Sequence, residues 1–294
     1  VNPFVGTDGY GNIYPGSQIP FGGIQISPDT DNHFYDAASG YKYSHPTIMG
    51  FSLSHLSGTG IPDLGDFLFV PGTGEIKSIP GTHENPDEGY RSRYSHEKEW
   101  ASPGYYGVEL IDYGVKAEMT SACRSGIFRF TYPASDKAFI LVDLNHTLWQ
   151  SCPWSNLRQL NDSTIVGYKL VKGWGPERHI YFAATFSRKL EHFYILQDGK
   201  PVIYNTKRFR SHKEAWGEKL MACFTFSTHT GEEVYVKTAI SGVSTEGALA
   251  NINELDGLTF ESVKSRAEEL WEKELGKYHV AGDLKTKRTF YTSA

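Results

Sequence analysis

The sequence of 294 residues lacks the long apolar segments and charged blocks that membrane-spanning or nucleic-acid-binding proteins contain. No apolar run approaches the roughly 20 residues that a bilayer-spanning helix needs. The formal net charge of −5 is spread along the chain without a basic block. Because nucleic acids and membrane surfaces attract clustered positive charge, we set both roles aside. The first residues carry no basic flank or cleavage pattern, so any export signal is expected to have been removed or never present.

Cysteine is scarce, and its spacing forms no motif. Cys123, Cys152 and Cys223 lie far apart without a Cys-x-x-Cys pair, which argues against a zinc site and against a redox motif. The sequence leaves open whether two of the three cysteines form a disulfide and the third is a free thiol. The sequence also has no Gly-x-Gly-x-x-Gly entering a helix, no internal repeat and no low-complexity tract, so nothing indicates a dinucleotide-binding or repeat fold.

The sequence is instead rich in aromatic residues and in short segments typical of β-strands. Hydrophobic residues make up 39% and aromatic residues 14% of the chain, which is ample for a large core. Strand-like segments recur at regular spacing without βαβ alternation, which predicts a mainly β protein, a large antiparallel β-sandwich over residues 1–243. The predicted strands are residues 104–112, 127–132, 138–144, 163–169, 178–186, 193–196, 202–204, 220–227 and 233–240.

The pattern changes near Ser244, where amphipathic helices replace strands. Ser244 is placed to cap a short helix, and Thr259 to cap a second one that Gly276 ends. A third helix begins near Leu284 and stops with the sequence. The large apolar faces of these helices need a partner that the sandwich does not fully supply. We therefore interpret residues 244–294 as linker helices and the beginning of a helical domain that is not in this chain.

One stretch, residues 50–66, joins a strand to a turn rich in glycine and hydroxyl groups. Period-two alternation carries the strand to His55. The turn Ser57-Gly58-Thr59-Gly60 follows, with glycines that permit positive φ or a close approach. A solvated hairpin connection is the simpler interpretation, and binding of a hydroxyl-rich ligand is the other. For His55 a satisfied, half-buried side chain is the default, and a sugar contact is the alternative.

Three carboxylates have structural interpretations beside functional ones. Asp63 and Asp66 lack further spaced ligands, so fixing the turn is favoured over a fragment of a metal site. Glu118 is expected in a strand, paired with a basic residue such as Arg124 or Arg129.

Short motifs follow one another over nearly the whole chain: Val1-Asn2-Pro3-Phe4-Val5-Gly6-Thr7, Tyr14-Pro15-Gly16, Pro20-Phe21-Gly22, Ser27-Pro28-Asp29-Thr30, Ser39-Gly40-Tyr41, Gly50-Phe51-Ser52, His55-Leu56-Ser57-Gly58-Thr59-Gly60, Ser102-Pro103-Gly104-Tyr105-Tyr106, Ala117-Glu118, Gly173-Trp174 and Phe290-Tyr291-Thr292. In this order they resemble the amino-terminal part of glycoside hydrolase family 92, the calcium-dependent, exo-acting α-mannosidases. A chance match to one motif would not extend along the chain in this way.

The resemblance implies a catalytic unit of two parts, the sandwich and a following (α/α)6 barrel, with the active site between them. Family members hydrolyse a terminal α-mannoside with inversion, using a general acid and a general base about 6.5–9.5 Å apart. A bound Ca²⁺ engages the mannose O2 and O3 atoms. The acid, the base and most calcium ligands belong to the barrel. The resemblance therefore assigns no catalytic residue and no metal ligand to this chain, which we expect to be inactive alone.

The resemblance also implies that the ligand is a mannose-containing glycan and that the partner is the chain's own C-terminal barrel. It further implies a periplasmic or secreted location and a role in N-glycan degradation. We expect sugar contacts from Tyr35, Asp36, His55, Ser57, Gly58 and Thr59. Residues 32–43 mix aromatic and hydroxyl groups, which suits a sugar ring and also packing at a sandwich end. Where many relatives have Trp-Cys before Ser-Gly-Tyr, this sequence has Ala37-Ala38. An α-1,2 linkage is therefore not assumed over α-1,3, α-1,4, α-1,6 or phosphate-linked mannose.

Two other functions compete with this one. A free-standing carbohydrate-binding module would use the same fold and aromatic loops without catalysis, and a structural surface domain would bind no sugar. The helices of residues 244–294 discriminate, because a free-standing module has no use for them.

Overall fold

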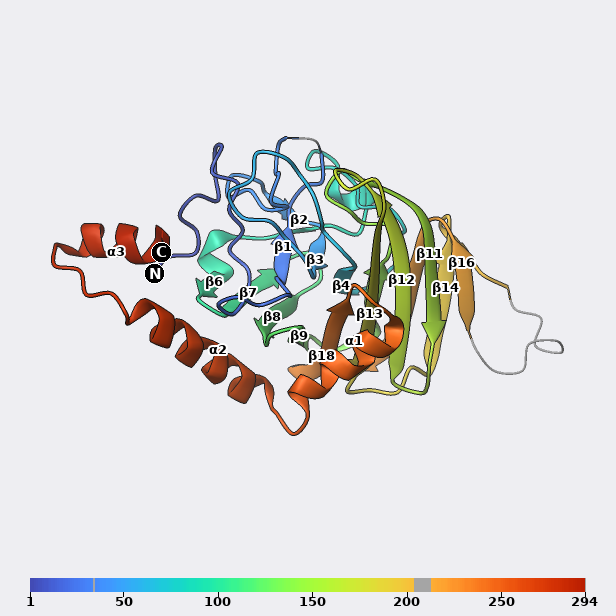
Figure 1. Ribbon diagram of the computed structural model, residues 1–294. Helices are drawn as coiled ribbons and strands as arrows, with labels where there is room; N and C mark the ends of the chain where they lie inside the picture. Colours follow the sequence, from blue (N-terminus) through green and yellow to red (C-terminus); the bar gives the residue numbers. More distant parts are fainter. Residues whose placement is uncertain (34, 204–212, 294) are drawn as a thin grey trace.

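The computed structural model describes residues 1–33, 35–203 and 213–293, and its two large antiparallel sheets lie face to face as a sandwich (Figure 1). The predicted mainly β class and antiparallel sandwich are confirmed. A small third sheet pairs Thr47–Ile48 (β2) with Ser92–Arg93 (β5).

One large sheet has seven strands, in the spatial order β1-β3-β4-β10-β17-β14-β15. They are Ser27–Asp29 (β1), Gly50–Ser52 (β3), Leu68–Thr73 (β4), Ser135–Asp143 (β10), Leu220–Thr228 (β17), His192–Gln197 (β14) and Lys200–Pro201 (β15). Phe51 of β3 lies opposite Phe69 of β4 in an antiparallel pair. Residues 53–67 therefore form a hairpin connection, as predicted.

The other large sheet has nine strands, in the order β16-β11-β12-β13-β18-β9-β8-β7-β6. They are Glu214–Gly217 (β16), Ser151–Gln159 (β11), Thr164–Lys172 (β12), Arg178–Phe186 (β13), Glu232–Ser241 (β18), Ser125–Tyr132 (β9), Val115–Ser121 (β8), Tyr105–Leu110 (β7) and Glu99–Ser102 (β6). Glu118 lies opposite Arg129 in this sheet. Arg129 Nε donates to Glu118 Oε2 at 2.9 Å, which confirms one of the two predicted partners.

Aromatic side chains fill the space between the two sheets. The Phe69 ring lies 5.1 Å from that of Phe128, and the Phe67 ring lies 4.4 Å from that of Phe182, centroid to centroid. All four rings are fully buried. Because successive strand residues point to opposite faces, the neighbour Ala183 belongs instead to the outer face of the nine-stranded sheet, under a helix.

The helices follow the strands, and their caps are those that the sequence predicts. They are Thr245–Ile252 (α1), Phe260–Leu275 (α2) and Leu284–Ser293 (α3), with single 3-10 turns at Pro86–Glu88 (η1), His96–Lys98 (η2) and Asn253–Leu255 (η3). Ser244 Oγ accepts from the Gly247 amide at 3.0 Å, and Thr259 Oγ1 accepts from the Ser262 amide at 3.2 Å. Such caps satisfy amide groups that a helix start leaves without a partner.

The first turn of α2 is anchored on the nine-stranded sheet. Phe260 and Val263 pack on Tyr105 and on the outer side of β9. Arg129 joins this contact, since its guanidinium lies 4.3 Å from the Phe260 ring centroid and donates to Glu261 Oε1 at 2.7 Å. Helix and sheet therefore share one mixed apolar and ionic contact.

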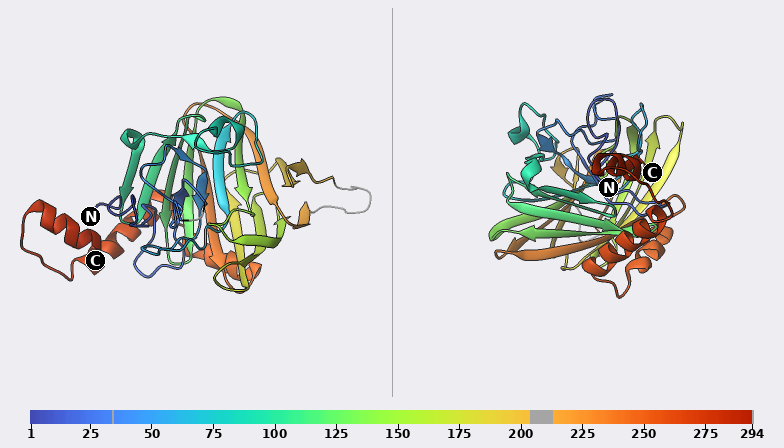
Figure 2. Two further views of the ribbon diagram at one scale, coloured as in Figure 1. Left: turned by 90° about the horizontal axis from the view of Figure 1, so that it is seen from above. Right: turned by 90° about the vertical axis from the view of Figure 1, so that its left-hand side faces the viewer.

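Beyond Ala267, which is buried against Gly104, α2 and then α3 leave the sandwich, as Figure 1 and the left view of Figure 2 show. The α3 helix has no buried residue among those described. Trp271 Nε1 donates to the Gln18 carbonyl at 2.7 Å, and the Asn2 amide donates to Thr292 Oγ1 at 3.0 Å. These contacts tether the two helices to the N-terminal loops.

Some strand predictions differ from the structure. The strand predicted to reach His55 ends at Ser52, because the chain turns there into a buried, hydrogen-bonded loop. The strand β11 was not predicted, since its sequence is mostly polar and contains a proline. Of the strand predicted at residues 202–204, the first two residues lie outside a strand and Tyr204 lies outside the described residues.

The three cysteines are free, so no disulfide forms; Cys123 is exposed, whereas Cys152 and Cys223 are buried. Within the described ranges, no helix is both long enough and apolar enough to cross a membrane.

The anchor of α2 gives a first prediction. Replacing the buried Phe260 (2% exposed) by alanine is expected to lower the free energy of unfolding by about 3–5 kcal/mol, because it opens a cavity between helix and sheet. Leu270→Ala on the same helix is the control, since this side chain is 40% exposed. Urea unfolding measures both, and equal losses would contradict the proposed anchor.

Candidate functional site

Two loops that flank the short strands β1 and β3 carry the predicted site residues. The first loop, residues 30–46, follows β1, and the second loop, residues 53–67, joins β3 to β4. Both contact the N-terminal segment, residues 1–16, because the carbonyls of Thr7 and Asn12 accept amides of the first and second loop at 2.9 and 2.7 Å. The structure thus brings the two loops to one region.

A buried carboxylate, Asp29, lies beneath both loops. Its Oδ1 lies 2.7 Å from His55 Nε2, and its Oδ2 lies 2.7 Å from His146 Nε2. The His55 Nδ1 atom lies 2.8 Å from the Gln25 carbonyl. Both ring nitrogens of His55 therefore have an oxygen within hydrogen-bond distance. Asp29 therefore joins β1, the second loop and the segment after β10.

Gly40 of the first loop rests directly on this pair. Its φ of +85° is left-handed, and a Cβ built on it would lie 2.1 Å from Asp29 Oδ1 and 3.1 Å from His55 Cδ2. Any side chain at this position would push the loop off the carboxylate, so only glycine fits. The Ser39-Gly40-Tyr41 motif is explained by this close approach.

The charge state of Asp29 follows from its partners. Burial on its own would raise the pKa of this carboxyl, but the charge and hydrogen bonds of His55 and His146 outweigh it and hold the pKa well below its usual value. Asp29 is thus an ionised carboxylate held by both imidazole rings, and it does not serve as a proton donor.

A second buried carboxylate, Asp66, ends the second loop. Arg178 Nη1 donates to its Oδ2 at 2.7 Å, Lys169 Nζ lies 3.1 Å from its Oδ1, and the Ser54 hydroxyl donates at 2.7 Å. Burial would raise the pKa of Asp66, but the two cations hold it well below its ordinary value. Lys169 Nζ also donates to the His146 carbonyl at 2.6 Å, so the two buried clusters are connected.

The structural role predicted for Asp63 and Asp66 is confirmed. Asp63 Oδ1 accepts from the Leu64 amide at 2.7 Å and fixes the turn. Two cations already pair with the Asp66 carboxylate, which agrees with its structural role.

Most of the predicted sugar-contacting residues lie at the surface of the two loops. Tyr35 is 55% exposed with a φ of 67°, and Asp36 is exposed and accepts from Lys42 Nζ at 2.7 Å. Ser57 and Gly58 are exposed, and Thr59 is half-buried.

His55 differs from them. Its side chain is enclosed beneath Gly40, and both ring nitrogens have partners. A direct sugar contact is therefore not available to His55, and the half-buried state expected for it is wrong. It supports the loops from within, because the chain turns inward after β3 instead of continuing as an exposed strand.

A cavity of 550 Å³ connects the second loop to the helices. Ser57 lines it together with Tyr14, Gly104, Trp271 and Tyr291. The N-terminal segment, the second loop and the two outer helices therefore share one concave surface.

Three exposed aromatic side chains were not singled out by the sequence analysis. Tyr10 is 99% exposed, Phe21 is 93% exposed and Trp174 is 65% exposed. Phe21 also has a φ of 61°, which is unusual for a bulky residue. Exposed rings on structured loops are typical of ligand or domain contacts. Their membership of the Pro20-Phe21-Gly22 and Gly173-Trp174 motifs was the signal that could have marked two of them.

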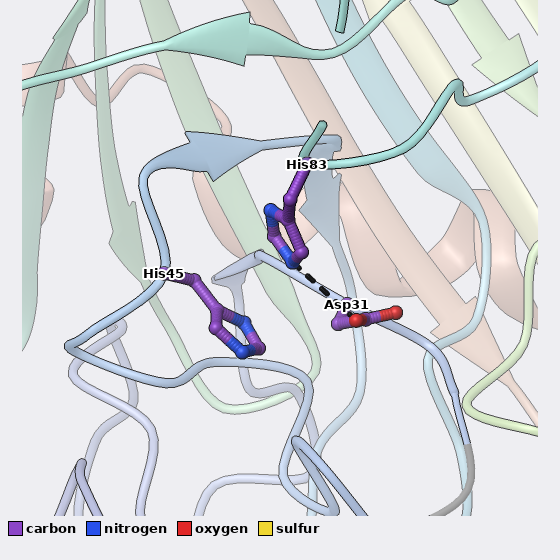
Figure 3. Close-up of side chains that lie close together, drawn as sticks. All are labelled: Asp31, His45 and His83. Atoms are coloured by element: carbon purple, nitrogen blue, oxygen red, sulfur yellow. Dashed lines mark ion pairs between the residues drawn. The ribbon is translucent and has the colours of Figure 1, made fainter. Parts of the chain in front are cut away.

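Asp31, His45 and His83 form the group of possible metal ligands in the part of the chain that the structure describes (Figure 3). Their ligand atoms lie within 4.8 Å of one another. Ca²⁺ takes six to eight oxygen ligands, whereas two of these three residues offer nitrogen. Asp31, His45 and His83 therefore do not suit a calcium ion.

Comparison with known proteins identifies the family. The sequence model "Glycosyl hydrolase family 92 N-terminal domain" matches residues 1–241. The chain belongs to glycoside hydrolase family 92. A solved structure of the same family, the α-mannosidase BT3965 from Bacteroides thetaiotaomicron, shares 76% sequence identity and a TM-score of 0.97 with this family 92 chain. It was also solved in complex with mannoimidazole.

More distant relatives show how far the likeness extends. The family 92 glycosyl hydrolase ccman5 is 26% identical with a TM-score of 0.84. An uncharacterized secreted glycosidase of Arthroderma benhamiae is 30% identical over 151 residues, which are 49% of this chain and 19% of that protein. This family 92 chain is covered completely by the BT3965 structure but spans 40% of that protein's chain.

The buried Asp29 gives a second prediction. Asp29→Asn is expected to lower the free energy of unfolding by about 3–5 kcal/mol, because two buried histidines lose their shared counter-charge. Asp198→Asn, at an exposed pair with Lys219, serves as the control and is expected to leave stability almost unchanged, because water screens such a pair. Chemical denaturation at pH 7 compares them. If Asp29→Asn lowered the free energy of unfolding no more than the control does, Asp29 would not be the residue that stabilises the two loops.

The two lowered pKa values give a third prediction. Because the pKa values of Asp29 and Asp66 are lower in the folded state, both carboxyls contribute stability above their unfolded pKa, and this is lost as the pH falls below about 4. Burial raises the pKa of Asp143, which has the opposite sign and partly offsets the loss. Urea midpoints from pH 7 to pH 3 should fall less steeply for Asp66→Asn than for the parent. Identical slopes would show that Asp66 is not linked to acid unfolding.

Proposed function

We propose that this chain is the sandwich part of an exo-acting, inverting, calcium-dependent α-mannosidase that trims terminal mannose from glycans. The observation that carries the proposal is its 76% identity, over its full length, to an α-mannosidase of family 92. The mannoimidazole complex of that relative supports a mannose-containing ligand.

The proposal includes a division of labour between two domains. Residues 1–243 form the sandwich, and residues 244–294 lead into a helical barrel that supplies the acid, the base and the calcium ligands. The state of three buried carboxylates supports this division, since Asp29, Asp66 and Glu118 are each paired with a basic side chain. A general acid needs a raised pKa near the working pH, and the pKa of each of these three carboxyls is lowered. Burial does raise the pKa of Asp143, but this carboxyl is 4% exposed and accepts from the Tyr90 hydroxyl at 2.9 Å.

We assign the two surface loops to the sugar. Tyr35, Asp36, Ser57, Gly58 and Thr59 would contact the glycan beyond or beside the terminal mannose, with His55 as their internal support. The exposure of Tyr35, Asp36, Ser57 and Gly58 supports this assignment, and so does the position of Ser57 in the wall of the helix-lined cavity. With Ala37-Ala38 in the first loop, the linkage preference would depend on Tyr35 and Asp36. The secreted relative supports a periplasmic or secreted location.

Mannose release tests the proposal directly. The protein joined to its helical domain is expected to release mannose from α-linked disaccharides, to lose activity with a chelator and to regain it with Ca²⁺. Proton NMR should show β-mannose first, as inversion requires. The chain of residues 1–294 alone is expected to release none. Release by the short chain, or α-mannose as the first product, would refute the mechanism. Mannose binding without release by the longer protein would favour the carbohydrate-binding module.

Thr59→Ala gives the fourth prediction. In the catalytic protein it is expected to raise KM several-fold with little change in kcat, because it removes a hydroxyl that bonds the Ile61 backbone and shapes the loop assigned to the glycan. Thr230→Ala, an exposed threonine in the turn between β17 and β18, is the matched control. Equal KM values for the two variants would show that Thr59 does not contribute to glycan binding.

A further inference from the structure

A second cavity lies where the chain passes from β10 to β11. Its volume is 550 Å³, within the roughly 300–1,000 Å³ that is typical of ligand pockets. Residues 143–153 form most of its wall, and Asn32, Tyr90 and Glu218 contribute from other parts of the chain. Its described lining residues all differ from those of the cavity beside α2 and α3. We call this cavity the β11 pocket.

An exposed tryptophan, Trp149, forms part of the wall of the β11 pocket. Its side chain is 51% exposed, and its φ of 80° is left-handed, which is rare for a bulky residue. The residues on both sides hold it there. The Leu148 amide donates to the Leu64 carbonyl at 3.0 Å. Gln150 Nε2 donates to the Pro62 carbonyl at 2.8 Å. Strained backbone that surrounding contacts maintain is common at ligand-binding positions.

Three polar side chains in the wall make no hydrogen bond to another described residue. They belong to Asn32 and Asn145, which are half-buried, and to Glu218, which is exposed. Gln150 lines the pocket too, and its buried Oε1 atom has no partner among the described residues. Turning this amide round would not help, because its Nε2 faces two backbone carbonyls. The wall therefore offers donors and acceptors that a ligand or water would satisfy.

The charges of the wall restrict the class of ligand. Among its described residues there is no lysine or arginine, so phosphate or sulfate would meet Asp143 and Glu218 without such a cation. An organic ammonium ion favours a cage of several aromatic faces. Trp149 is the one exposed aromatic ring among the described residues of the wall. A sugar suits the pocket better, because its apolar face packs on one ring while its hydroxyls both donate and accept.

We propose that the β11 pocket binds a hexose unit of a glycan, stacked on Trp149 and hydrogen-bonded by the three unpaired side chains. Asn32 also belongs to the first loop, so the pocket borders the surface that we assign to the glycan. A branched glycan that reaches both places gains from the second contact, since linked sites raise the effective local concentration. The choice of mannose as the hexose rests on the proposed function.

Binding of α-linked mannotriose to the chain of residues 1–294 tests the pocket. We expect a Kd on the order of 1 mM, because one stacked ring and a few hydrogen bonds contribute modestly. Trp149→Ala should weaken binding at least about tenfold, since a stacked tryptophan dominates such a contact. Asn145→Ala should weaken it about 3–10-fold through the loss of one hydrogen bond. Calorimetry measures all three proteins, and their Tm values report whether each variant folds.

The control variant is Trp100→Ala. Trp100 is 41% exposed on β6, at the opposite edge of the nine-stranded sheet from β16, and its loss should leave affinity unchanged. Proton–nitrogen NMR locates the sugar, because the indole N–H signal missing from Trp149→Ala belongs to Trp149. This signal is expected to shift during the titration, whereas that of Trp100 should stay in place.

Four outcomes would overturn the proposal. They are no sugar binding, equal affinities for the Trp149 and Trp100 variants, an indole shift at Trp271 of the helix-lined cavity without one at Trp149, and tighter binding of choline than of mannotriose. Mannose release by the longer protein is a separate measurement. A failure of the pocket and a failure of the mannosidase proposal are therefore told apart.

Discussion

The buried ion pair between Asp29 and its two histidines is the constraint on which the loop region depends. Burying a carboxylate without water or cations would cost several kcal/mol. The folded state is therefore stable with Asp29 buried only if both His55 and His146 contact its carboxylate. His146 lies 117 residues away in the sequence, and its carbonyl also binds the lysine that neutralises Asp66. The two short strands and both loops are therefore fixed by charges that only the complete sandwich assembles.

The sequence predicted the regular elements well where local rules decide them. Ser244 and Thr259 cap α1 and α2 because a hydroxyl precedes an amphipathic run, and β13 has the predicted bounds because its apolar residues alternate. The prediction failed at β11, a mostly polar strand. There, pairing with β12 and β16 along Ser155 to Arg158 decides the conformation. Such pairing is a tertiary effect that no local pattern reveals.

The site was less predictable, for a related reason. Tyr35 and Ser57 could be proposed as glycan contacts because they belong to loops of unusual composition. His146 and Lys169 could not, because neither belongs to a local motif and both gain their role only from contacts across the sandwich. Asp29 stood within a recognised motif but received no role, since its burial cannot be read from Ser27-Pro28-Asp29-Thr30 alone. Long-range charge pairing is thus the information that the sequence pattern lacked.

The first loop must reconcile rigidity with access to a ligand. Gly40 fixes the loop near its middle on Asp29, but Tyr35 and Asp36 lie several residues away and are exposed. Asp36 already accepts from Lys42 and lies against His45. A carboxylate offers about four acceptor positions, so Asp36 can hold these two partners and still receive a sugar hydroxyl. The pairs that Asp36 makes with Lys42 and His45 therefore stiffen the loop from within and leave acceptor positions of its carboxylate for the proposed glycan contact.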